Sequence, residues 1–142
     1  MEIKNNQLTI DIPEGMEIDL ESSDLAKGIV KFKKKDITYD DILKTYATDF
    51  GGLRVPNHCI DKVLAISQLM NIARYYNKDW KPNWISPGQL KWYIYYSDGK
   101  YQMGTTSCCC NYGTIYFRFR DYVQAVINNP NFRDILDAIY KN

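Results

Sequence analysis

The sequence predicts a single α+β domain spanning residues 1–142, because helical and strand patterns occupy separate stretches of the chain. Apolar residues recur at helical spacing from Ile60 to Asn77 and alternate with polar residues from Leu90 to Arg120, and helical spacing returns near the C-terminus. With 142 residues, of which 45% are hydrophobic, the chain can bury one core without a disulfide or metal.

Short strands are expected in the N-terminal segment. Gln7–Pro13 alternates leucine and isoleucine with polar residues, Met16–Leu20 repeats this over a shorter distance, and Ile29–Lys33 is expected to form a third strand. The basic run that includes Lys33 suggests phosphate contacts. The solvent side of an edge strand is the better interpretation, because acidic residues lie close on both sides of the run.

Helix-capping and helix-breaking residues divide the middle of the chain into short elements. Thr38–Asp41 resembles a helix capping box and predicts a short helix ending near Thr48. Leu53–Val55 is expected to be a brief extended piece. Asn57 fits the N-cap of the next helix, and Asn77 fits a left-handed residue at its C-terminal end.

The helix predicted over Ile60–Asn77 organises the rest of the chain. Its main apolar stripe is expected to consist of Val63, Ile66, Met70 and Ala73. Further apolar residues lie on its other sides, which is typical of a helix that is covered on several sides.

Two tryptophans, Trp80 and Trp84, follow this helix and allow two interpretations. They could form a stacking platform for a ligand, or they could close over the end of the core, with Pro82 and Pro87 restricting the loop. We favour packing, because aromatic residues beside a buried helix usually belong to the core.

Alternation continues in three runs, Leu90–Tyr96, Tyr101–Cys110 and Thr114–Arg120. The Asp98–Gly99 pair between the first two runs tolerates the positive φ angles of a tight hairpin. The three runs therefore predict a three-stranded antiparallel meander.

Two helices are expected after the meander. Asp121 can cap a helix from Tyr122 to about Asn128, and Phe132–Tyr140 carries the last helical pattern. The predicted fold is therefore an N-terminal β segment, a central buried helix, a three-stranded antiparallel meander and two C-terminal helices, packed in two layers.

Composition excludes several classes of protein. Lys and Arg number 18 against 17 Asp and Glu, a formal net charge of +1, which gives no general attraction to nucleic acid or anionic membranes. The first residues lack the apolar segment of a signal peptide, and the central helix is too short and too charged to span a membrane. We therefore expect a cytoplasmic protein with no membrane attachment and free thiols.

Catalytic and metal-binding motifs were sought in the sequence. His58 is the only histidine, so a cysteine nucleophile drawn from Cys108–Cys110 would depend on it as a base. A zinc site of His58, Cys59 and two of these later cysteines would lack the usual Cys-x-x-Cys spacing. We expect no catalytic residues, no metal and no cofactor, and whether Cys108–Cys110 carry any chemistry stays open.

Several stretches together resemble a family of small uncharacterised proteins encoded by phages and other mobile elements of gut anaerobes. The family pattern reads I-x-I-P-E-G-x-E-I-D, F-K-K-K, W-K-P-x-W and K-x-Y-I. The matching stretches in this chain are Ile10–Asp19, Ile29–Lys35, Trp80–Trp84 and Lys91–Tyr96. Two departures are Met16, where an aromatic residue is usual, and the ending Asn129–Tyr140. The resemblance implies a phage or mobile-element origin and a shared fold, and it transfers no catalytic residue.

The function that the sequence favours is that of a non-enzymatic accessory protein of a phage or mobile element. It would bind a host or phage protein in the host cytoplasm, and a protein partner is favoured over nucleic acid. Tyr93, Tyr95 and Tyr116 are expected on the faces opposite the apolar ones, where a tyrosine-rich sheet surface suits recognition.

The alternative is a single-stranded nucleic-acid-binding protein. Bases would stack on Trp80, Trp84 or the sheet tyrosines, while a lysine and arginine strand face that includes Lys33 and Arg118 would hold phosphates. Two further hypotheses are a small enzyme that uses His58, and a component of the virion. The sequence leaves open the partner, the oligomeric state and a role in replication, assembly or counter-defence.

Overall fold

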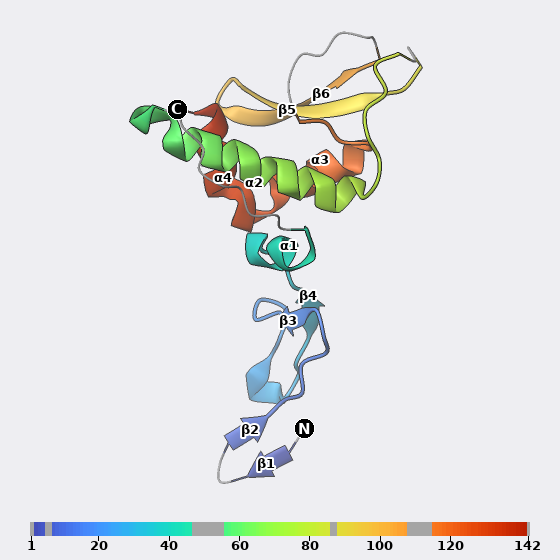
Figure 1. The fold of residues 1–142 in the computed structure, drawn as a ribbon. Coiled ribbons are helices and arrows are strands. Elements are labelled where there is room, and N and C mark those ends of the chain that lie inside the picture. Colours follow the sequence, from blue (N-terminus) through green and yellow to red (C-terminus); the bar gives the residue numbers. More distant parts are fainter. Residues whose placement is uncertain (1, 5–6, 47–55, 86–87, 108–114, 142) are drawn as a thin grey trace. The chain divides into compact units, whose positions relative to one another are not determined.

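A computed structural model describes most of the chain, namely residues 2–4, 7–46, 56–85, 88–107 and 115–141. The protein is of the mixed α and β class, as predicted (Figure 1). It divides into two compact units, Met1–Asp36 and Ile37–Asn142. The single domain over residues 1–142 stays a prediction. The extended piece at Leu53–Val55 and the three cysteines Cys108–Cys110 lie outside the described residues.

The N-terminal unit consists of two small antiparallel hairpins. Strand β1 (Glu2–Lys4) pairs with β2 (Gln7–Thr9), and β3 (Met16–Ile18) pairs with β4 (Phe32–Lys34). Each of the three predicted stretches contains a strand: β2 and β3 are shorter than predicted, whereas β4 begins at Phe32 rather than Ile29 and ends one residue later, at Lys34. The 3₁₀ turn η1 (Leu25–Lys27) lies between β3 and β4, and no side chain described between residues 9 and 36 is buried. The exposed large apolar residues of this unit are Ile12, Leu20, Leu25 and Ile29.

Helix α1 (Tyr39–Tyr46) begins at the predicted capping box. The Asp41 backbone N–H donates to Thr38 Oγ1 at 3.2 Å, and the Thr38 backbone N–H donates to Asp41 Oδ2 at 3.0 Å. Two first-turn donors that would otherwise lack partners are thereby satisfied. One apolar residue of α1, Ile42, is fully buried in the core.

Helix α2 spans Ile60–Asn77, with the predicted boundaries. Its buried residues are Ala65, Leu69, Ile72 and Ala73. The predicted stripe is wrong in part, because Met70 is 52% exposed. The buried set follows the spacing i, i+4, i+7 and i+8, which forms one face of a helix. The helix is therefore covered on one side, and apolar residues such as Leu64 remain exposed on another.

Both predicted caps of α2 are wrong. Asn57 lies in a short 3₁₀ turn, η2 (Asn57–Cys59), and α2 begins after Cys59 without a side-chain cap. At the other end Lys78, and not Asn77, has a positive φ of 55°. The Asn77 side chain binds the backbone of a distant segment instead, so its tendency toward left-handed conformations is not used.

The hairpin of β5 (Lys91–Ser97) and β6 (Lys100–Thr106) is confirmed, with Asp98 and Gly99 at φ 53° and 76°. A third meander strand is not formed in the described residues. Phe117 makes an isolated antiparallel bridge to Trp92, so it lies beside β5 rather than β6.

Helices α3 (Arg120–Asn128) and α4 (Arg133–Tyr140) complete the unit, with the turn η3 (Pro130–Phe132) between them. The predicted Asp121 cap is wrong, because α3 begins at Arg120, two residues before the predicted start at Tyr122, and makes no side-chain cap hydrogen bond at Phe119. The hairpin packs its inner face on the helices (Figure 1). Buried apolar side chains of α1, α2, β5, α3, η3 and α4 and of the bridged segment form one core: Ile42, Ala65, Leu69, Ile72, Ala73, Ile94, Phe117, Val123, Val126, Ile127, Phe132, Ile135 and Leu136.

Candidate binding groove

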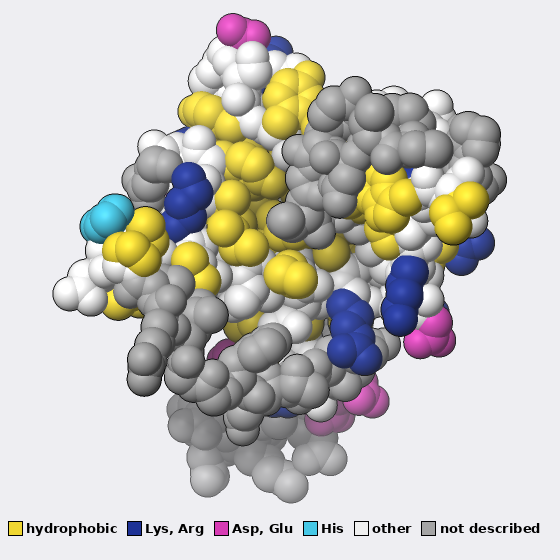
Figure 2. Space-filling model, turned by 45° about the horizontal axis from the view of Figure 1, so that its top comes forward, with side chains coloured by type: hydrophobic (Ala, Val, Ile, Leu, Met, Phe, Trp, Pro, Cys, Tyr) yellow, Lys and Arg dark blue, Asp and Glu magenta, His cyan; other side chains and the backbone are white. Residues whose placement is uncertain are grey.

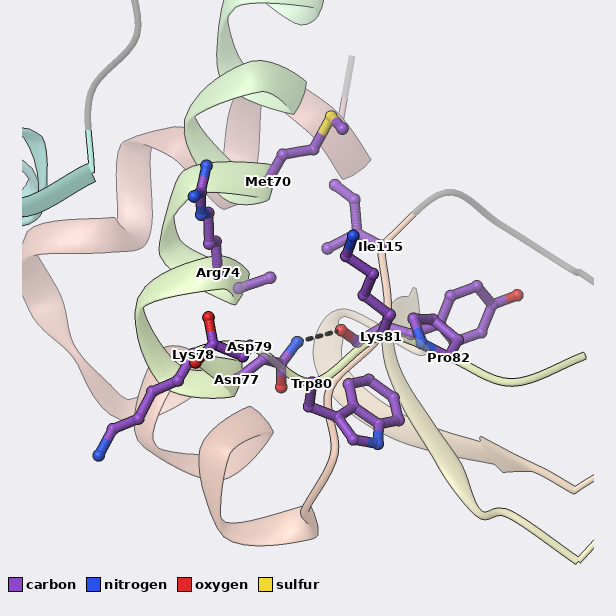
Figure 3. Close-up of a pocket in the computed structure, with 11 residues that line it drawn as sticks. Met70, Arg74, Asn77, Lys78, Asp79, Trp80, Lys81, Pro82 and Ile115 are labelled. Atoms are coloured by element: carbon purple, nitrogen blue, oxygen red, sulfur yellow. Dashed lines mark hydrogen bonds between the residues drawn. The ribbon is translucent and has the colours of Figure 1, made fainter.

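A groove of about 550 Å³ lies where the C-terminal end of α2 meets the following loop and the segment at Tyr116 (Figure 3). We call it the Trp80 groove. Its lining combines apolar, aromatic and charged side chains from these three parts of the chain. The lining residues are Met70, Ala73, Arg74, Asn77, Lys78, Asp79, Trp80, Lys81, Pro82, Ile115 and Tyr116.

A tight turn at the end of α2 forms one wall of the Trp80 groove. The Trp80 backbone N–H donates to the Asn77 carbonyl at 3.0 Å, and the Lys78 N–H donates to the Arg74 carbonyl at 2.8 Å. Lys78 has φ 55° and ψ −118°, the values of the first central residue of a type II′ turn. Glycine is strongly favoured at that position, so a lysine there stores backbone strain.

The Asn77 side chain holds the opposite wall in place. Its Nδ2 donates to the Tyr116 carbonyl at 2.8 Å, and its Oδ1 accepts the Arg118 backbone N–H at 2.9 Å. One amide thus pairs with a backbone acceptor and a backbone donor of the same segment, as a neighbouring strand would. The end of α2 is thereby tied to the segment that bridges to Trp92 on β5.

The charged side chains of the groove are mostly cationic. Arg74, Lys78 and Lys81 line it, against one carboxylate, Asp79. Lys78 and Lys81 make no ion pair within the described part of the chain. Figure 3 shows Lys81 extending toward Ile115, while Lys78 points outward at the rim. The groove therefore pairs a partly apolar wall with a positive edge.

Aromatic rings continue from the groove along the outer face of β5. Trp84 lies against Tyr116 with ring centroids 4.9 Å apart, Tyr116 lies 6.1 Å from Tyr93, and Tyr93 lies 6.2 Å from Tyr95. The structure thus brings these four predicted binding residues together. Trp80 is close by, because it shares the groove lining with Tyr116.

The tyrosine-studded face is less open than the sequence suggests. Tyr116 is only 5% exposed, and Tyr95 is 37% exposed, with its hydroxyl donating to Gln102 Oε1 at 3.1 Å. Tyr93 lies over Gly104, its partner on β6, so closely that a Cβ at Gly104 would collide with the ring. Most of this face is therefore occupied by contacts within the chain.

Trp84 packs against the sheet. The Lys91 ammonium lies 4.8 Å from the centroid of the Trp84 ring and donates to the Gln89 carbonyl at 2.9 Å. Lys91 is fully buried beneath this ring. Since the Trp84 ring contacts both Lys91 and the Tyr116 ring, Trp84 fits the packing interpretation, whereas Trp80 lines the groove.

The two predicted cationic residues lie in different units. Lys33 belongs to the N-terminal unit, where its ammonium lies 3.4 Å from Glu17 Oε1 across the β3–β4 pair. Arg118 is exposed, and its guanidinium stacks over the Phe119 ring at 4.9 Å. Three cationic residues of the groove, Arg74, Lys78 and Lys81, were not predicted from the sequence. The signal that could have found them is the stretch Asn77–Lys81, which closely follows Arg74 and mixes charged residues with a tryptophan.

Hydrophobic side chains also gather on one face of the molecule, with lysine and arginine side chains near the edge of the patch (Figure 2). Exposed apolar residues of the C-terminal unit include Met70 in the groove and Ile60 and Leu64 on α2. Exposed apolar surface bordered by charge is typical of interaction sites.

Three further findings concern metal binding, membrane spanning and similarity to known proteins. Within the described ranges no group of three His, Cys, Asp or Glu side chains could hold a metal ion, and His58 is exposed in η2. None of the helices described has the length and apolarity that crossing a membrane requires. Comparisons with family models, curated proteins and solved structures find no match. The chemistry of the site is therefore argued from its geometry.

Proposed function

We propose that this is a non-enzymatic binding protein that holds a segment of another protein in the Trp80 groove. The observation that carries the proposal is the positive edge of Arg74, Lys78 and Lys81 beside the exposed Met70 and the ring of Trp80. The complementary segment carries acidic side chains next to apolar ones. The resemblance to phage and mobile-element proteins supports an accessory role in a host cytoplasm, with a host or phage protein as the partner.

The composition of the groove suits a protein segment. Trp, Tyr, Met and Arg are enriched in protein interfaces, and a few such residues usually carry most of the binding energy. Acidic side chains on the partner would meet Lys81 and Arg74, and its apolar side chains would cover Met70 and Trp80. Complementary charge of this kind raises the association rate and selects the partner.

Single-stranded nucleic acid is the second candidate, because Trp80 offers a ring next to Lys78 and Lys81. This alternative is weaker, since nonspecific binding uses several stacking rings in succession. Trp84 and Tyr116 already contact each other, and Tyr116 is buried. Among the described residues, Trp80 is the candidate aromatic residue that lines the groove without a contact to another aromatic ring.

A displayed peptide library selected against the whole protein tests the proposal. We expect enriched peptides to combine Asp or Glu with large apolar residues, and to bind Trp80→Ala and Lys81→Met at least roughly tenfold more weakly, as for interface hot spots. Lys44→Met is the matched control, since Lys44 is exposed on α1 and its nearest acid is Asp41 at 4.0 Å.

Two results would overturn the assignment. Selected peptides that bind Trp80→Ala as tightly as the unaltered protein would place the site elsewhere. An unstructured oligonucleotide that binds with a steep loss of affinity at higher salt, while no peptide is enriched, would favour nucleic acid.

A further inference from the structure

A second pocket lies at the other end of the β5–β6 hairpin. It has a volume of about 260 Å³ and is formed by the hairpin turn together with residues of α3 and α4 and the end of the described chain. Figure 1 shows the C-terminal end of α4 beside this end of the hairpin. The lining residues are Tyr96, Gly99, Lys100, Tyr101, Ile127, Arg133 and Lys141.

Every charged side chain in this lining is a cation. The Arg133 guanidinium lies 5.0 Å from the Tyr101 ring centroid, and the Lys141 ammonium lies 5.5 Å from the Tyr96 centroid and 5.7 Å from that of Tyr101. Lys100 follows directly from the turn. Three positive groups from three separate places in the sequence are thus held around two tyrosine rings.

Two acids lie near this pocket: Asp98, in the turn, accepts the Ser97 hydroxyl at 3.0 Å, and Asp137 is already occupied. Asp137 accepts the Tyr101 hydroxyl, and the Lys141 ammonium lies 2.9 Å from the same carboxylate oxygen. The hydrogen bond from Tyr101, then that from Lys141, lowers the pKa of Asp137, whereas burial and the bond to Asp137 raise the pKa of Tyr101. Tyr101 therefore stays neutral and adds no negative charge to the pocket.

Two of the three cations keep their charge available. Lys100 and Arg133 make no ion pair within the part of the chain that the structure describes. One Arg133 Nη donates to the Ile127 carbonyl at 3.0 Å, which orients the guanidinium and leaves its remaining N–H groups for a ligand. A guanidinium presents paired donors that match the oxygens of a phosphate.

We propose that this pocket binds a phosphate dianion, either free or as a phosphomonoester. Its volume lies below the roughly 300–1,000 Å³ of pockets for drug-sized ligands, which fits a single phosphoryl group. Lys100 and Arg133 hold the phosphoryl oxygens, Lys141 adds charge at longer range, and the ring of Tyr96 offers an apolar contact to an ester group. This site shares no residue with the Trp80 groove, so either assignment can fail without the other.

The test is a titration of the whole isotope-labelled protein, followed by backbone amide shifts. Sodium phosphate, and separately phenyl phosphate, replaces sodium chloride at constant ionic strength. We expect saturable shifts at Gly99, Lys100, Tyr101 and Arg133, with Lys100→Met and Arg133→Met each weakening affinity roughly tenfold, as the loss of one charge-assisted hydrogen bond implies. Lys44→Met, at an exposed position of α1 outside this pocket, is the matched control and should bind as the unaltered protein does.

The two ligands distinguish the sources of the phosphate. Equal affinities indicate a site for the free ion, whereas tighter binding of phenyl phosphate indicates an ester whose organic part contacts Tyr96. Shifts that do not saturate, or that survive unchanged in Lys100→Met, would overturn the proposal. Because Lys100 is exposed at the start of β6, its replacement should leave the melting temperature unchanged, and the test stays decisive if Arg133→Met unfolds.

Discussion

The hairpins β3–β4 and β5–β6 arise from the same sequence pattern but have different surroundings. Both alternate apolar and polar residues and pair in antiparallel register. The strands of β3–β4 have three residues each, and neither Ile18 nor Phe32 is buried. The strands of β5–β6 have seven residues each, and Ile94 is buried with helical side chains in the core.

This difference shows that alternating apolar and polar residues predict a strand but do not predict which other elements pack on it. A lone two-stranded hairpin is marginally stable in water, and it needs a helix or a further strand for independent stability. Helices provide that cover for β5–β6. The Trp80 groove and the phosphate pocket both lie in this covered unit, where side chains can be held in a constant arrangement.

The largest loss of stability is expected at Leu69, and Leu20 is its matched control. Leu69→Ala, at a fully buried position of α2, should cost about 2–5 kcal/mol of unfolding free energy, because it leaves a cavity in the core. Leu20→Ala, at a position that is 70% exposed, should change it by less than about 0.5 kcal/mol. Denaturant unfolding followed by far-UV circular dichroism, which reports on the backbone of both units, measures both, and equal costs would remove the distinction between the units.

A smaller loss should follow from Asn77→Ala. It removes two hydrogen bonds and leaves the Tyr116 carbonyl and Arg118 N–H without that partner, at a cost of about 1–3 kcal/mol. Asn128→Ala is the control, because Asn128 is exposed and accepts a surface bond from Gln124. Similar costs for both variants would show that Asn77 does not hold the groove together.

Alkaline pH should destabilise the C-terminal unit. Burial raises the pKa of Tyr140 from 10.0 to about 12, so the folded state favours the neutral phenol. Its contribution is complete below pH 10 and is lost as the pH rises toward 12, by at most about 2 kcal/mol. No tyrosine occurs among residues 1–36, so tyrosinate absorbance reports on the other unit alone. Tyr140→Phe should reduce this alkaline decline, with the rest coming from Tyr101, whose pKa is also raised, and an unchanged decline would mean that Tyr140 is not buried in solution.

The smallest expected effect is a gain in stability. Lys78→Gly relieves the strained φ of 55°, partly offset by greater freedom of the unfolded chain, for a net gain of about 1 kcal/mol. Lys81→Gly, three residues on in the same loop and without a positive φ, should give no gain. If Lys78 binds an acidic side chain of the partner, Lys78→Gly should be more stable than the unaltered protein and should bind the selected peptides more weakly. A loss of stability would show that the turn differs in solution.

Local patterns in the sequence predicted much of the fold. The capping box at Thr38–Asp41, the boundaries of α2 and the Asp98–Gly99 turn all depend on neighbouring residues, and all were confirmed. The third meander strand failed because the position of Phe117 beside Trp92 depends on pairing between distant segments, which alternation does not encode.

The groove was harder to predict for a related reason. Trp80 and Tyr116 were candidates, but their proximity depends on the Asn77 side chain, which bonds across about 40 residues of sequence. Lys78 gave no local signal, because a lysine at positive φ goes against its own preference. Tertiary contacts overrule such preferences most often at functional sites.

Hydrogen exchange on the whole protein, with and without a selected peptide, distinguishes the Trp80 groove from the other surfaces and the covered hairpin from the uncovered one. We expect slow exchange in α2 and β5–β6 and fast exchange in β3–β4 without peptide. With peptide, added protection should appear at residues 74–82 and 115–118 and nowhere in residues 16–34. Protection gained in β3–β4, or on the outer face of β5 with none at the end of α2, would contradict the Trp80 groove as the binding site.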